Sequence, residues 1–494
     1  MNQHDPQPSR RQALKALGLM GTAMTLDQAT AAPATATPVK TAEFRDELRQ
    51  HIEQTTLADT HEHFVDEEDR LQGKNLPCDD WAFLFAHYLD SDFRSSGIPL
   101  ENFQKLTSRK VDPETKWALI APYWPAVKNT GYGQAVRITL RELYGIEELN
   151  DQTAKGLQRA YEATRKPGFY DRILKDLAKI ESCQINCITG KPFGETRHPT
   201  FQLQDLSIVA MQSGSEVEKL ATPAGVQVRD LADWHKVIEW WFDKYGPYAV
   251  AVKSQMAYSR SLDYEQVAAE KAEAIFKRSV VERQPVSAAE QKSMQDHLFW
   301  YCVKQADKHH LPVKLHTGYY AGHNNMPLGR VAGNPAEASE LCRKSKETQF
   351  VFMHVAYPYW QPLIAVAKHY TNAHIDMCWA WIIDPVASVQ FLKNYLVTAP
   401  SNKVLTFGGD YIPVECVLGH ARIARHGIHL ALAQLVDEGW LTKRDALELV
   451  EPLMHGNARQ IFSLEAKQRK LQSPPWLKPD GSALPVSSRR ERRS

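Results

Sequence analysis

Eight short apolar runs, separated by stretches with helical patterning, constrain the fold of this chain more than any other feature of its sequence. The runs lie at 56–64, 179–190, 206–214, 248–258, 311–320, 349–358, 373–381 and 403–411. Near-continuous apolar runs that alternate with helices are typical of parallel strands buried on both faces. Eight such units predict a TIM-type (β/α)8 barrel, an α/β fold whose active site lies at the carboxyl ends of the strands.

The stretches between the runs support this architecture. Helical periodicity is clearest at 231–245, 288–309, 335–347 and 387–396, and two or three helices follow the last run between Val417 and Phe462. Residues 66–177 contain no convincing strand, so we expect a distorted barrel with a large helical insertion after strand 1. The loop at 129–133 of this insertion is either a substrate-contacting segment or a packing loop.

The N-terminus has the pattern of an export signal. Twin arginines, Arg10 and Arg11, precede a modestly apolar segment and a small-residue cleavage site at 29–31. Residues 1–31 therefore resemble a twin-arginine signal peptide, which predicts export by that machinery to the periplasm or the medium; the alternative is a basic disordered tail.

The remaining boundaries follow from composition and patterning. We expect a linker at 32–41, a lead-in helix at 42–54, a barrel domain at 42–471 and a solvated, flexible tail at 472–494.

Charge and cysteine content exclude several classes of protein. The formal net charge of +1 argues against a nucleic-acid or membrane-surface binder, and no apolar run after the signal is long enough for a membrane span. The seven cysteines show no Cys-x-x-Cys spacing and mostly lie in apolar context, which favours buried thiols, although one oxidised pair stays open.

Polar residues with metal-ligand chemistry gather at the predicted strand ends. His61 and His63 lie one residue apart, so in a strand both side chains point to the same face. With 19 histidines in the chain, that pair alone is weak evidence. Four further residues lie near the ends of other runs: Lys253, His316, His354 and Asp410.

Imidazole and carboxylate suit zinc and related divalent ions, and a catalytic site keeps one position open for water. A lysine has no lone pair for a metal while it is protonated. Buried beside cations, Lys253 would lose its proton more easily, and the neutral amine could then become a carbamate that bridges two ions. We therefore expect one or two divalent ions, zinc first, with Asp410 accepting the proton of the attacking water.

This set, in this strand order, resembles the amidohydrolase superfamily. The resemblance lies in residues 59–63, Lys253, 315–318, 353–354 and 408–410, and residues 455–462 are similar to the C-terminal helix of its amidohydrolase-related branch. It implies a divalent-metal hydrolase in which His61, His63, His316, His354 and Asp410 are ligands and Lys253 bridges two ions. The sequence HYLDSDF at 87–93 is distantly similar to uronate isomerases of the same superfamily, which leaves the reaction class open.

Loop residues after strands 4, 5 and 7 are candidates for binding substrate. Arginine can hold a carboxylate bidentately, and tryptophans can wall an apolar pocket, although ion-pair and packing roles are alternatives. The candidates are Arg260, Tyr319, Arg330, Trp379 and Trp381, with Tyr258 and His323 beside them.

The sequence as a whole predicts an exported metal-dependent hydrolase that acts on an ester, lactone or amide bond of a small molecule. A non-hydrolytic chemistry, decarboxylation or uronate isomerisation, is the first alternative. A periplasmic binding protein that has lost turnover is the second, and the sequence leaves a homo-oligomer open.

Overall fold

The computed structural model describes residues 38–74, 76, 78–187, 190–322 and 326–478. The chain divides into two compact units, Met1–Phe44 and Arg45–Ser494. The first unit is described only from Pro38, where helix α2 (Pro38–Gln54) begins. The predicted signal peptide therefore lies outside the described residues, and the end of the predicted linker, residues 38–41, is helical instead.

Each of the eight apolar runs contains a strand, and all strand pairs are parallel. The strands are β1 (Leu57–Glu62), β2 (Ile180–Ile185), β3 (Gln202–Gln204), β4 (Leu206–Ser207), β5 (Val252–Ser254), β6 (Val313–His316), β7 (Phe350–Met353), β8 (Ala373–Asp376) and β9 (Val404–Leu405). They form two sheets, β1-β2-β3 and β4-β5-β6-β7-β8-β9.

Backbone hydrogen bonds connect the two sheets at both ends. β3 and β4 are separated by Asp205 alone, and the Asp205 N–H donates to the Ile185 carbonyl at 2.9 Å. At the other end, the Thr60 N–H donates to the Phe407 carbonyl at 3.0 Å, and the Asp410 N–H donates to the His61 carbonyl at 2.7 Å. With β3 and β4 counted as one interrupted strand, eight parallel strands follow one another around a ring, which confirms the predicted TIM-type barrel.

Two predicted runs are strands over only part of their length. In the run at 206–214, β4 ends at Ser207 and helix α11 (Val209–Ser213) follows. The run at 373–381 ends as strand at Asp376, and helix α18 (Ala380–Ile383) begins soon after. A short apolar run does not distinguish a buried strand from a buried helix. The prediction therefore extended both strands too far, into residues that form α11 and α18.

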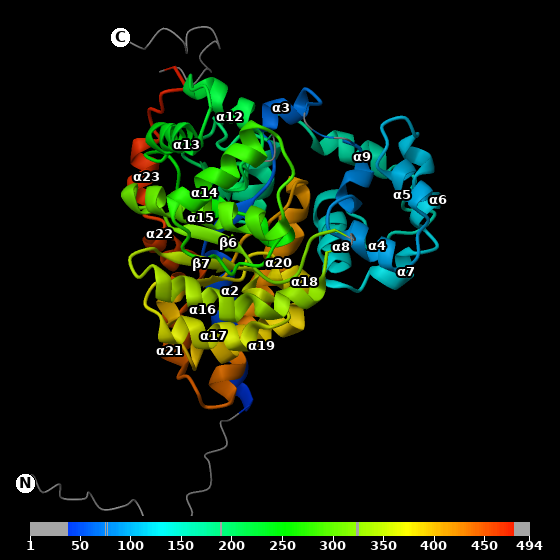
Figure 1. The fold of residues 1–494 in the computed structure, drawn as a ribbon. Coiled ribbons are helices and arrows are strands. Elements are labelled where there is room, and N and C mark those ends of the chain that lie inside the picture. The colour runs from blue at the N-terminus through cyan, green and yellow to red at the C-terminus, as the bar shows by residue number, and fades with distance from the viewer. Residues whose placement is uncertain (1–37, 75, 77, 188–189, 323–325, 479–494) are drawn as a thin grey trace, which may run out of the picture. The chain divides into compact units, whose positions relative to one another are not determined.

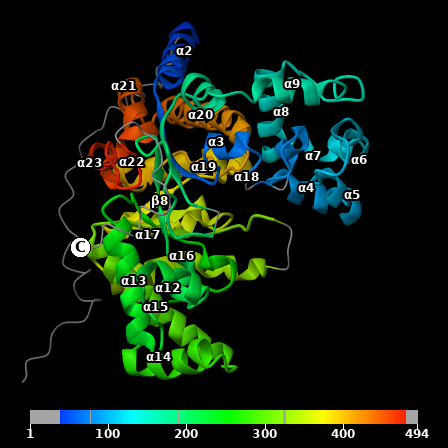
Figure 2. The ribbon, with the colours of Figure 1, turned by 90° about the horizontal axis from the view of Figure 1, so that it is seen from above.

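The segment between β1 and β2 is helical, as predicted. Its helices are α3 (Glu67–Leu71), α4 (Leu89–Ser95), α5 (Leu100–Leu106), α6 (Trp117–Ile120), α7 (Trp124–Val127), α8 (Gly131–Tyr144), α9 (Leu157–Thr164) and α10 (Phe169–Asp171), with shorter turns at Trp81–Phe85 and Pro113–Thr115 and a π-helical stretch at Arg172–Leu177. Helices α4 to α9, drawn in cyan, form a group of their own in both views (Figure 1, Figure 2).

A buried arginine connects this insertion to the barrel. The Arg70 guanidinium donates to both carboxylate oxygens of Glu415, at 3.0 and 2.6 Å, from helix α20 (Val414–Asp437). It also lies 5.2 Å from the ring centres of Phe83 and Phe169. A charge that is both paired and stacked on aromatic rings holds its neighbours in one geometry, so the insertion is anchored to the helix that follows β9.

The helices that surround the strands are α12 (Val217–Ala224), α13 (Leu231–Tyr245), α14 (Ala269–Phe276), α15 (Ala288–Lys308), α16 (Asn334–Lys344), α17 (Trp360–His369) and α19 (Pro385–Leu396), followed after β9 by α20, α21 (Lys443–Glu448), α22 (Asn457–Ile461) and α23 (Leu464–Lys470). Four of the helices around the strands match the predicted ones closely, namely α13, α15, α16 and α19, whereas α12, α14 and α17 were not predicted. None of the described helices is long and apolar enough to cross a membrane.

The start of the predicted tail is packed in part. Trp476 is 2% exposed, and its indole N–H donates to the Thr196 carbonyl at 2.9 Å. Its ring also packs edge-on against Phe193. An indole that buries its ring and satisfies its N–H is well held, so Trp476 is packed against the barrel domain, whereas Gln472, Ser473, Pro475 and Lys478 are exposed, as expected of a solvated tail.

Candidate metal centre

Four strand ends of the barrel bring metal-ligand side chains into one buried cluster. His61 lies on β1 and His63 directly follows it, while His354, Cys378 and Asp410 follow β7, β8 and β9. All five side chains are buried. The carboxyl ends of parallel barrel strands converge on one face, which is why residues so far apart in the sequence meet there.

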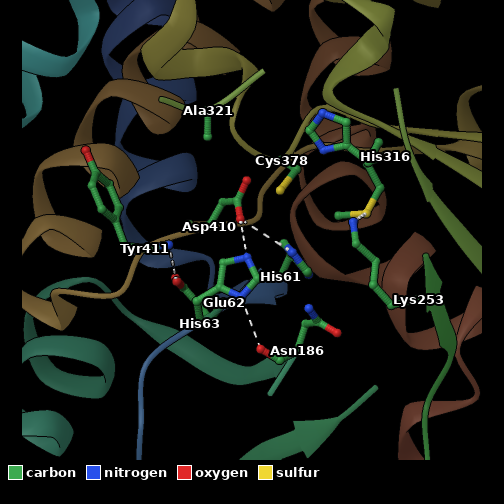
Figure 3. A network of polar contacts seen from close by, with 12 residues as sticks. His61, Glu62, His63, Asn186, Lys253, His316, Ala321, Cys378, Asp410 and Tyr411 are labelled. Atoms are coloured by element: carbon green, nitrogen blue, oxygen red, sulfur yellow. Dashed lines mark hydrogen bonds and ion pairs between the residues drawn. The ribbon is translucent and has the colours of Figure 1, made fainter. Parts of the chain in front are cut away.

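The carboxylate of Asp410 is the centre of this cluster. Its Oδ1 lies 3.1 Å from His63 Nε2 and 3.4 Å from His61 Nε2. Its Oδ2 lies 3.8 Å from His354 Nε2. Figure 3 shows the two β1 histidines directed at this carboxylate, with Cys378 beside it. The structure thus unites four of the six predicted ligands.

The tautomer of His63 tests whether the cluster fits a metal ion. His63 Nδ1 lies 3.1 Å from the Asn186 carbonyl oxygen, which can only accept, so Nδ1 carries the proton. The Nε2 of His63 faces an oxygen of Asp410 at 3.1 Å, and His61 Nε2 faces the same oxygen at 3.4 Å. Two imidazole nitrogens and a carboxylate oxygen gathered this closely are a donor set that a divalent cation accepts. The residues present therefore fit a divalent ion.

His61 is held neutral and has one unused ring nitrogen. Burial, and then the neighbouring Lys253, keep the pKa of His61 well below its usual value. Its Nδ1 has no hydrogen-bond partner among the described atoms and lies 3.8 Å from Asp205 Oδ2. A histidine that binds a metal through Nε2 carries its proton on Nδ1, usually directed at a carboxylate, and Asp205 is in that position.

Asp205 is itself part of a buried ion pair inside the barrel. Lys314 Nζ donates to both its carboxylate oxygens, at 3.0 and 2.9 Å, and to the Thr60 carbonyl at 2.7 Å. Both charged side chains are fully buried. Lys314 on β6 thus contacts both Asp205, between β3 and β4, and the backbone of β1 at Thr60, the residue before His61.

Two glycines bring Asp410 to the end of β1. A Cβ on Gly408 would lie 2.8 Å from both Cys378 Sγ and Thr60 Oγ1, and a Cβ on Gly409 would lie 1.8 Å from Glu62 Oε1. A side chain at either position would force these neighbouring side chains to move. The absence of a side chain therefore allows this segment to approach β1 and β8 closely enough to carry Asp410 into the cluster.

Asp410 is also fixed through its backbone and its surroundings. The Tyr88 hydroxyl donates to its carbonyl at 2.6 Å, and its φ of 59° lies in the left-handed region that few non-glycine residues adopt. Burial alone would raise the pKa of this carboxyl, but the histidines His61, His63 and His354 hold it well below its usual value. Asp410 is therefore an anionic ligand at neutral pH.

Two predicted ligands lie beside the cluster rather than in it. The Nε2 of His316 contacts the Tyr319 carbonyl at 2.9 Å and so carries a proton. The ammonium of Lys253 contacts Met353 Sδ at 2.6 Å, and burial lowers its pKa to about 8. Figure 3 shows both side chains at the edge of the network.

The predicted substrate residues fall into two groups. Arg260 pairs with Asp296 at 2.5 Å, and Arg330 donates to the carbonyls of Ala257 and Tyr258, so both guanidinium groups have structural partners. The Trp381 indole donates to the Thr406 carbonyl at 2.7 Å in the core. His323 lies outside the described residues.

Trp379 belongs to an aromatic wall next to the cluster. Its ring packs edge-on against His354 at 5.5 Å and stacks on Tyr88 at 4.6 Å, and it lies 6.0 Å from Tyr319. Tyr132, from the first turn of α8, is parallel to it at 6.1 Å. The Trp379 indole N–H and the Tyr132 hydroxyl are buried without a hydrogen-bond partner among the described atoms.

Close backbone packing places Tyr132 at this wall. A Cβ on Gly131 would lie 2.2 Å from the Ile382 carbonyl oxygen of α18, so the start of α8 touches the backbone of the segment that carries Trp379. The Thr130 side chain accepts from the Gly133 N–H at 3.1 Å and caps the helix. The loop at 129–133 thus packs against the segment that carries Trp379, and its contact with substrate stays a prediction.

Sequence reasoning missed Cys378, Asp205, Lys314, Tyr88 and Tyr132. For Cys378 a signal was present, since it lies within the predicted run at 373–381, two residues after β8 ends, and cysteine is a metal ligand. A lysine inside an apolar strand, as at Lys314, signals a buried partner. The partner itself and the two tyrosines depend on tertiary contacts.

Comparison with known proteins agrees with this geometry. The sequence model of the Amidohydrolase family matches residues 218–464, half of the chain. Protein fluG from Emericella nidulans is 25% identical over 155 residues, which are 31% of this chain and only 17% of the length of fluG.

Solved structures resemble nearly the whole chain. Glucuronate isomerase from Caulobacter crescentus has a TM-score of 0.70 at 17% identity and covers 90% of this chain and 97% of its own. Uronate isomerase from Thermotoga maritima has a TM-score of 0.68 at 15% identity, covering 85% and 97%. These likenesses establish the fold, including the insertion.

Proposed function

Because this chain belongs to the amidohydrolase superfamily, whose enzymes use divalent metals, we propose that it is a metal-dependent hydrolase of small molecules. The proposed substrate carries an ester, lactone or amide bond. The observation that carries the proposal is the convergence of His61 Nε2 and His63 Nε2 on Asp410 Oδ1, at 3.4 and 3.1 Å.

His61, His63 and Asp410 would hold the ion. Two imidazoles and a carboxylate are a ligand set that zinc accepts, with a position left for water. When bound there, a divalent ion supplies Lewis acidity, which lowers the pKa of water and polarises a carbonyl oxygen. Asp205 would accept a hydrogen bond from the His61 Nδ1–H and so hold that ring in its orientation.

Asp410 is the residue proposed to move the proton. Its Oδ1 faces the two β1 histidines, which leaves Oδ2 with lone pairs on the side of His354. From there the carboxylate can accept a proton from the attacking water and return it to the leaving group. The hydrogen bond from Tyr88 to the Asp410 carbonyl holds this residue in place.

The lining of the site favours an uncharged, partly apolar substrate. Trp379, Tyr88, Tyr132 and Tyr319 present aromatic surface next to His354, and such surface binds apolar groups. The guanidinium groups of Arg260 and Arg330, which sequence reasoning proposed for a substrate carboxylate, are paired within the protein. The substrate would then be oriented by stacking and by the unpaired donors of Trp379 and Tyr132.

Isomerisation of a sugar acid is the second candidate. It rests on the likeness of nearly the whole chain to a glucuronate isomerase. It requires a group that binds the substrate carboxylate, and Lys253 would have to provide it.

Activity assays on purified, metal-reconstituted protein test the two candidates. Neutral aryl and alkyl esters, lactones and amides would be screened beside glucuronate and galacturonate, with protein stripped by a chelator as the control. Hydrolysis that disappears with the metal and returns with zinc supports the proposal. Turnover of the sugar acids alone refutes it, and metal binding without any turnover favours a binding protein.

Export is a separate proposal that rests on the sequence. The twin arginines and the cleavage motif before residue 32 favour a periplasmic or secreted protein that is exported already folded. This route would suit a protein that must acquire its ion before it leaves the cytoplasm.

A further inference from the structure

The turn that follows β7 has an uncommon backbone. His354, Val355 and Ala356 have φ values of 62°, 51° and 52°, so three consecutive residues with a side chain are left-handed. This conformation costs free energy at any residue with a Cβ, and a β-branched valine is an outlier there. Such residues persist only where the surrounding structure holds them, and they cluster at functional sites. The turn therefore needs both a clamp and a purpose.

The clamp is the side chain of Thr317, which directly follows β6 and is fully buried. Its hydroxyl donates to the carbonyl of Met353, the last residue of β7. The same oxygen accepts from the Ala356 N–H at 3.1 Å. One hydroxyl thus binds the backbone on both sides of the turn, and loss of it would leave a buried N–H without a partner.

The segment after β6 is pressed against the turn by a glycine. Gly318 has a φ of 77°, and a Cβ there would lie 2.5 Å from the Tyr357 nitrogen. The Gly318 N–H donates to Asn334 Oδ1 at 2.7 Å, which fixes this segment to α16. Because glycine allows this close approach, the hydroxyl of the preceding residue, Thr317, stays within hydrogen-bond reach of the turn.

The turn decides where the ring of His354 points. Its Nε2 lies 3.8 Å from Asp410 Oδ2, and its ring packs edge-on against Trp379 at 5.5 Å. His63 is oriented by a contact between its Nδ1 and the Asn186 carbonyl, but the Nδ1 of His354 has no hydrogen-bond partner among the described atoms. The orientation of the His354 ring therefore depends on its backbone, and a turn that relaxed to negative φ would carry the ring away from Asp410.

We propose that Thr317 is a positioning residue, which holds residues 354–356 in the left-handed turn that directs His354 at Asp410 Oδ2. The inference rests on the proposed function, in which that oxygen accepts the proton of the attacking water. The His354 ring borders the space beside Oδ2, and so it limits where that water can lie. Thr317 acts on this space only through the backbone of the turn.

Three variants of the full-length protein test this role. Thr317→Val removes the hydroxyl but keeps the shape of the side chain, and Thr317→Ser keeps the hydroxyl. Thr348→Val is the matched control, because Thr348 is fully buried just before β7 and its hydroxyl donates to Asp307 Oδ2 at 2.9 Å. The measurements are the melting temperature, the zinc affinity of the metal-free protein, and kcat and KM with para-nitrophenyl acetate or the best neutral ester of the screen.

Thr317→Val should lower kcat by about 10- to 100-fold, the usual effect of a small misplacement in an active site, and should leave KM and zinc affinity within about twofold of wild type. Thr317→Ser should restore most of kcat. Thr348→Val should lose a similar amount of melting temperature, about 1–2 °C, but keep kcat. An unchanged kcat in Thr317→Val overturns the proposal, and so does a loss that Thr317→Ser does not recover or that zinc affinity follows. If the valine variant does not fold, Thr317→Ala takes its place.

Nuclear magnetic resonance of histidine-labelled protein separates this proposal from the proposed function, because it needs no substrate. The ring signal of His354 is the one that is missing in His354→Asn. Thr317→Val should shift or broaden that signal, whereas Thr348→Val should leave it in place. If the wild type hydrolyses no ester, the proposed function fails, but a shifted signal in Thr317→Val still supports the positioning of the ring. An unshifted signal overturns that positioning whether or not the protein is active.

Discussion

Asp205→Asn separates two roles of one buried carboxylate. Asp205 balances the charge of Lys314, to which it is bonded at 2.9 and 3.0 Å, and it faces the unpaired Nδ1 of His61 at 3.8 Å. The first role concerns stability and the second concerns metal affinity. The variant should lower both, while Lys314→Met should lower stability alone.

The size of each effect follows from burial. Removing one partner of a fully buried ion pair costs about 3–5 kcal/mol, because the remaining charge is left without compensation. For a domain of this length, an unfolding entropy of roughly 0.9 kcal/mol per kelvin converts that loss into a melting temperature lower by about 3–5 °C. Loss of a carboxylate that orients a metal-binding histidine typically costs about 10- to 100-fold in metal affinity.

A four-member cycle provides the assay. Wild type, Asp205→Asn, Lys314→Met and the double variant would be compared by thermal unfolding of the metal-free proteins and by zinc affinity from competition with a chelating dye. The double variant should regain much of the stability, because no lone charge remains, but none of the affinity. Two results would refute the role of Asp205 in orienting His61. One is a zinc affinity that changes in parallel with the melting temperature across the four proteins, and the other is an unchanged zinc affinity in Asp205→Asn.

Four further predictions address other parts of the molecule. Asp410→Asn should slow turnover by about 10²–10⁴-fold while a metal ion still binds; unchanged turnover would exclude Asp410 as the proton acceptor. Tyr132→Phe should reduce kcat/KM about tenfold, because one hydrogen bond to substrate is lost. It should not lower the melting temperature, because the hydroxyl has no hydrogen-bond partner among the described atoms. A lower melting temperature with normal kinetics would show that the Tyr132 hydroxyl has a structural role. Burial, and then Lys403, lower the pKa of His374 to about 4. The unfolded chain therefore binds this proton at a higher pH than the folded protein does, and the free energy of unfolding falls as pH drops from about 6.5 towards 4, by up to about 1.4 kcal/mol per pH unit. In urea unfolding, His374→Asn should lose less stability than wild type over that pH range, and the same pH dependence in both proteins would contradict this. Replacing Arg10 and Arg11 by lysine should retain the precursor in the cytoplasm, as measured by cell fractionation, and normal export would exclude the twin-arginine route.

The barrel could be predicted from the sequence because its strands are buried on both faces. Runs such as 349–358 are apolar at nearly every position, and this pattern hardly occurs elsewhere in soluble proteins. β3 (Gln202–Gln204) escaped prediction because two of its three residues are glutamines that are buried against other polar groups. Asp205, which separates β3 from β4, carries a charge whose role is clear only once its contact with Lys314 across the barrel is seen.

The candidate site was predictable in part for the same reason. His61, His63, His354 and Asp410 could be found because each lies near the end of an apolar run, and parallel strands bring their carboxyl ends together. Strand position does not reveal the rotamer, so it could not show that His316 Nε2 contacts the Tyr319 carbonyl.

The aromatic wall was less accessible to prediction. The approach of Tyr132 to Trp379 depends on a glycine that touches the Ile382 carbonyl more than two hundred residues away. No local pattern contains that information.

The seam at which β1 meets the segment after β9 has a consequence for how the protein is made. The backbone hydrogen bond from Asp410 to His61 joins residues near opposite ends of the chain. The segment that carries Asp410 must therefore have left the ribosome before the three proposed ligands can meet, so the ion can be captured only late in translation or after it.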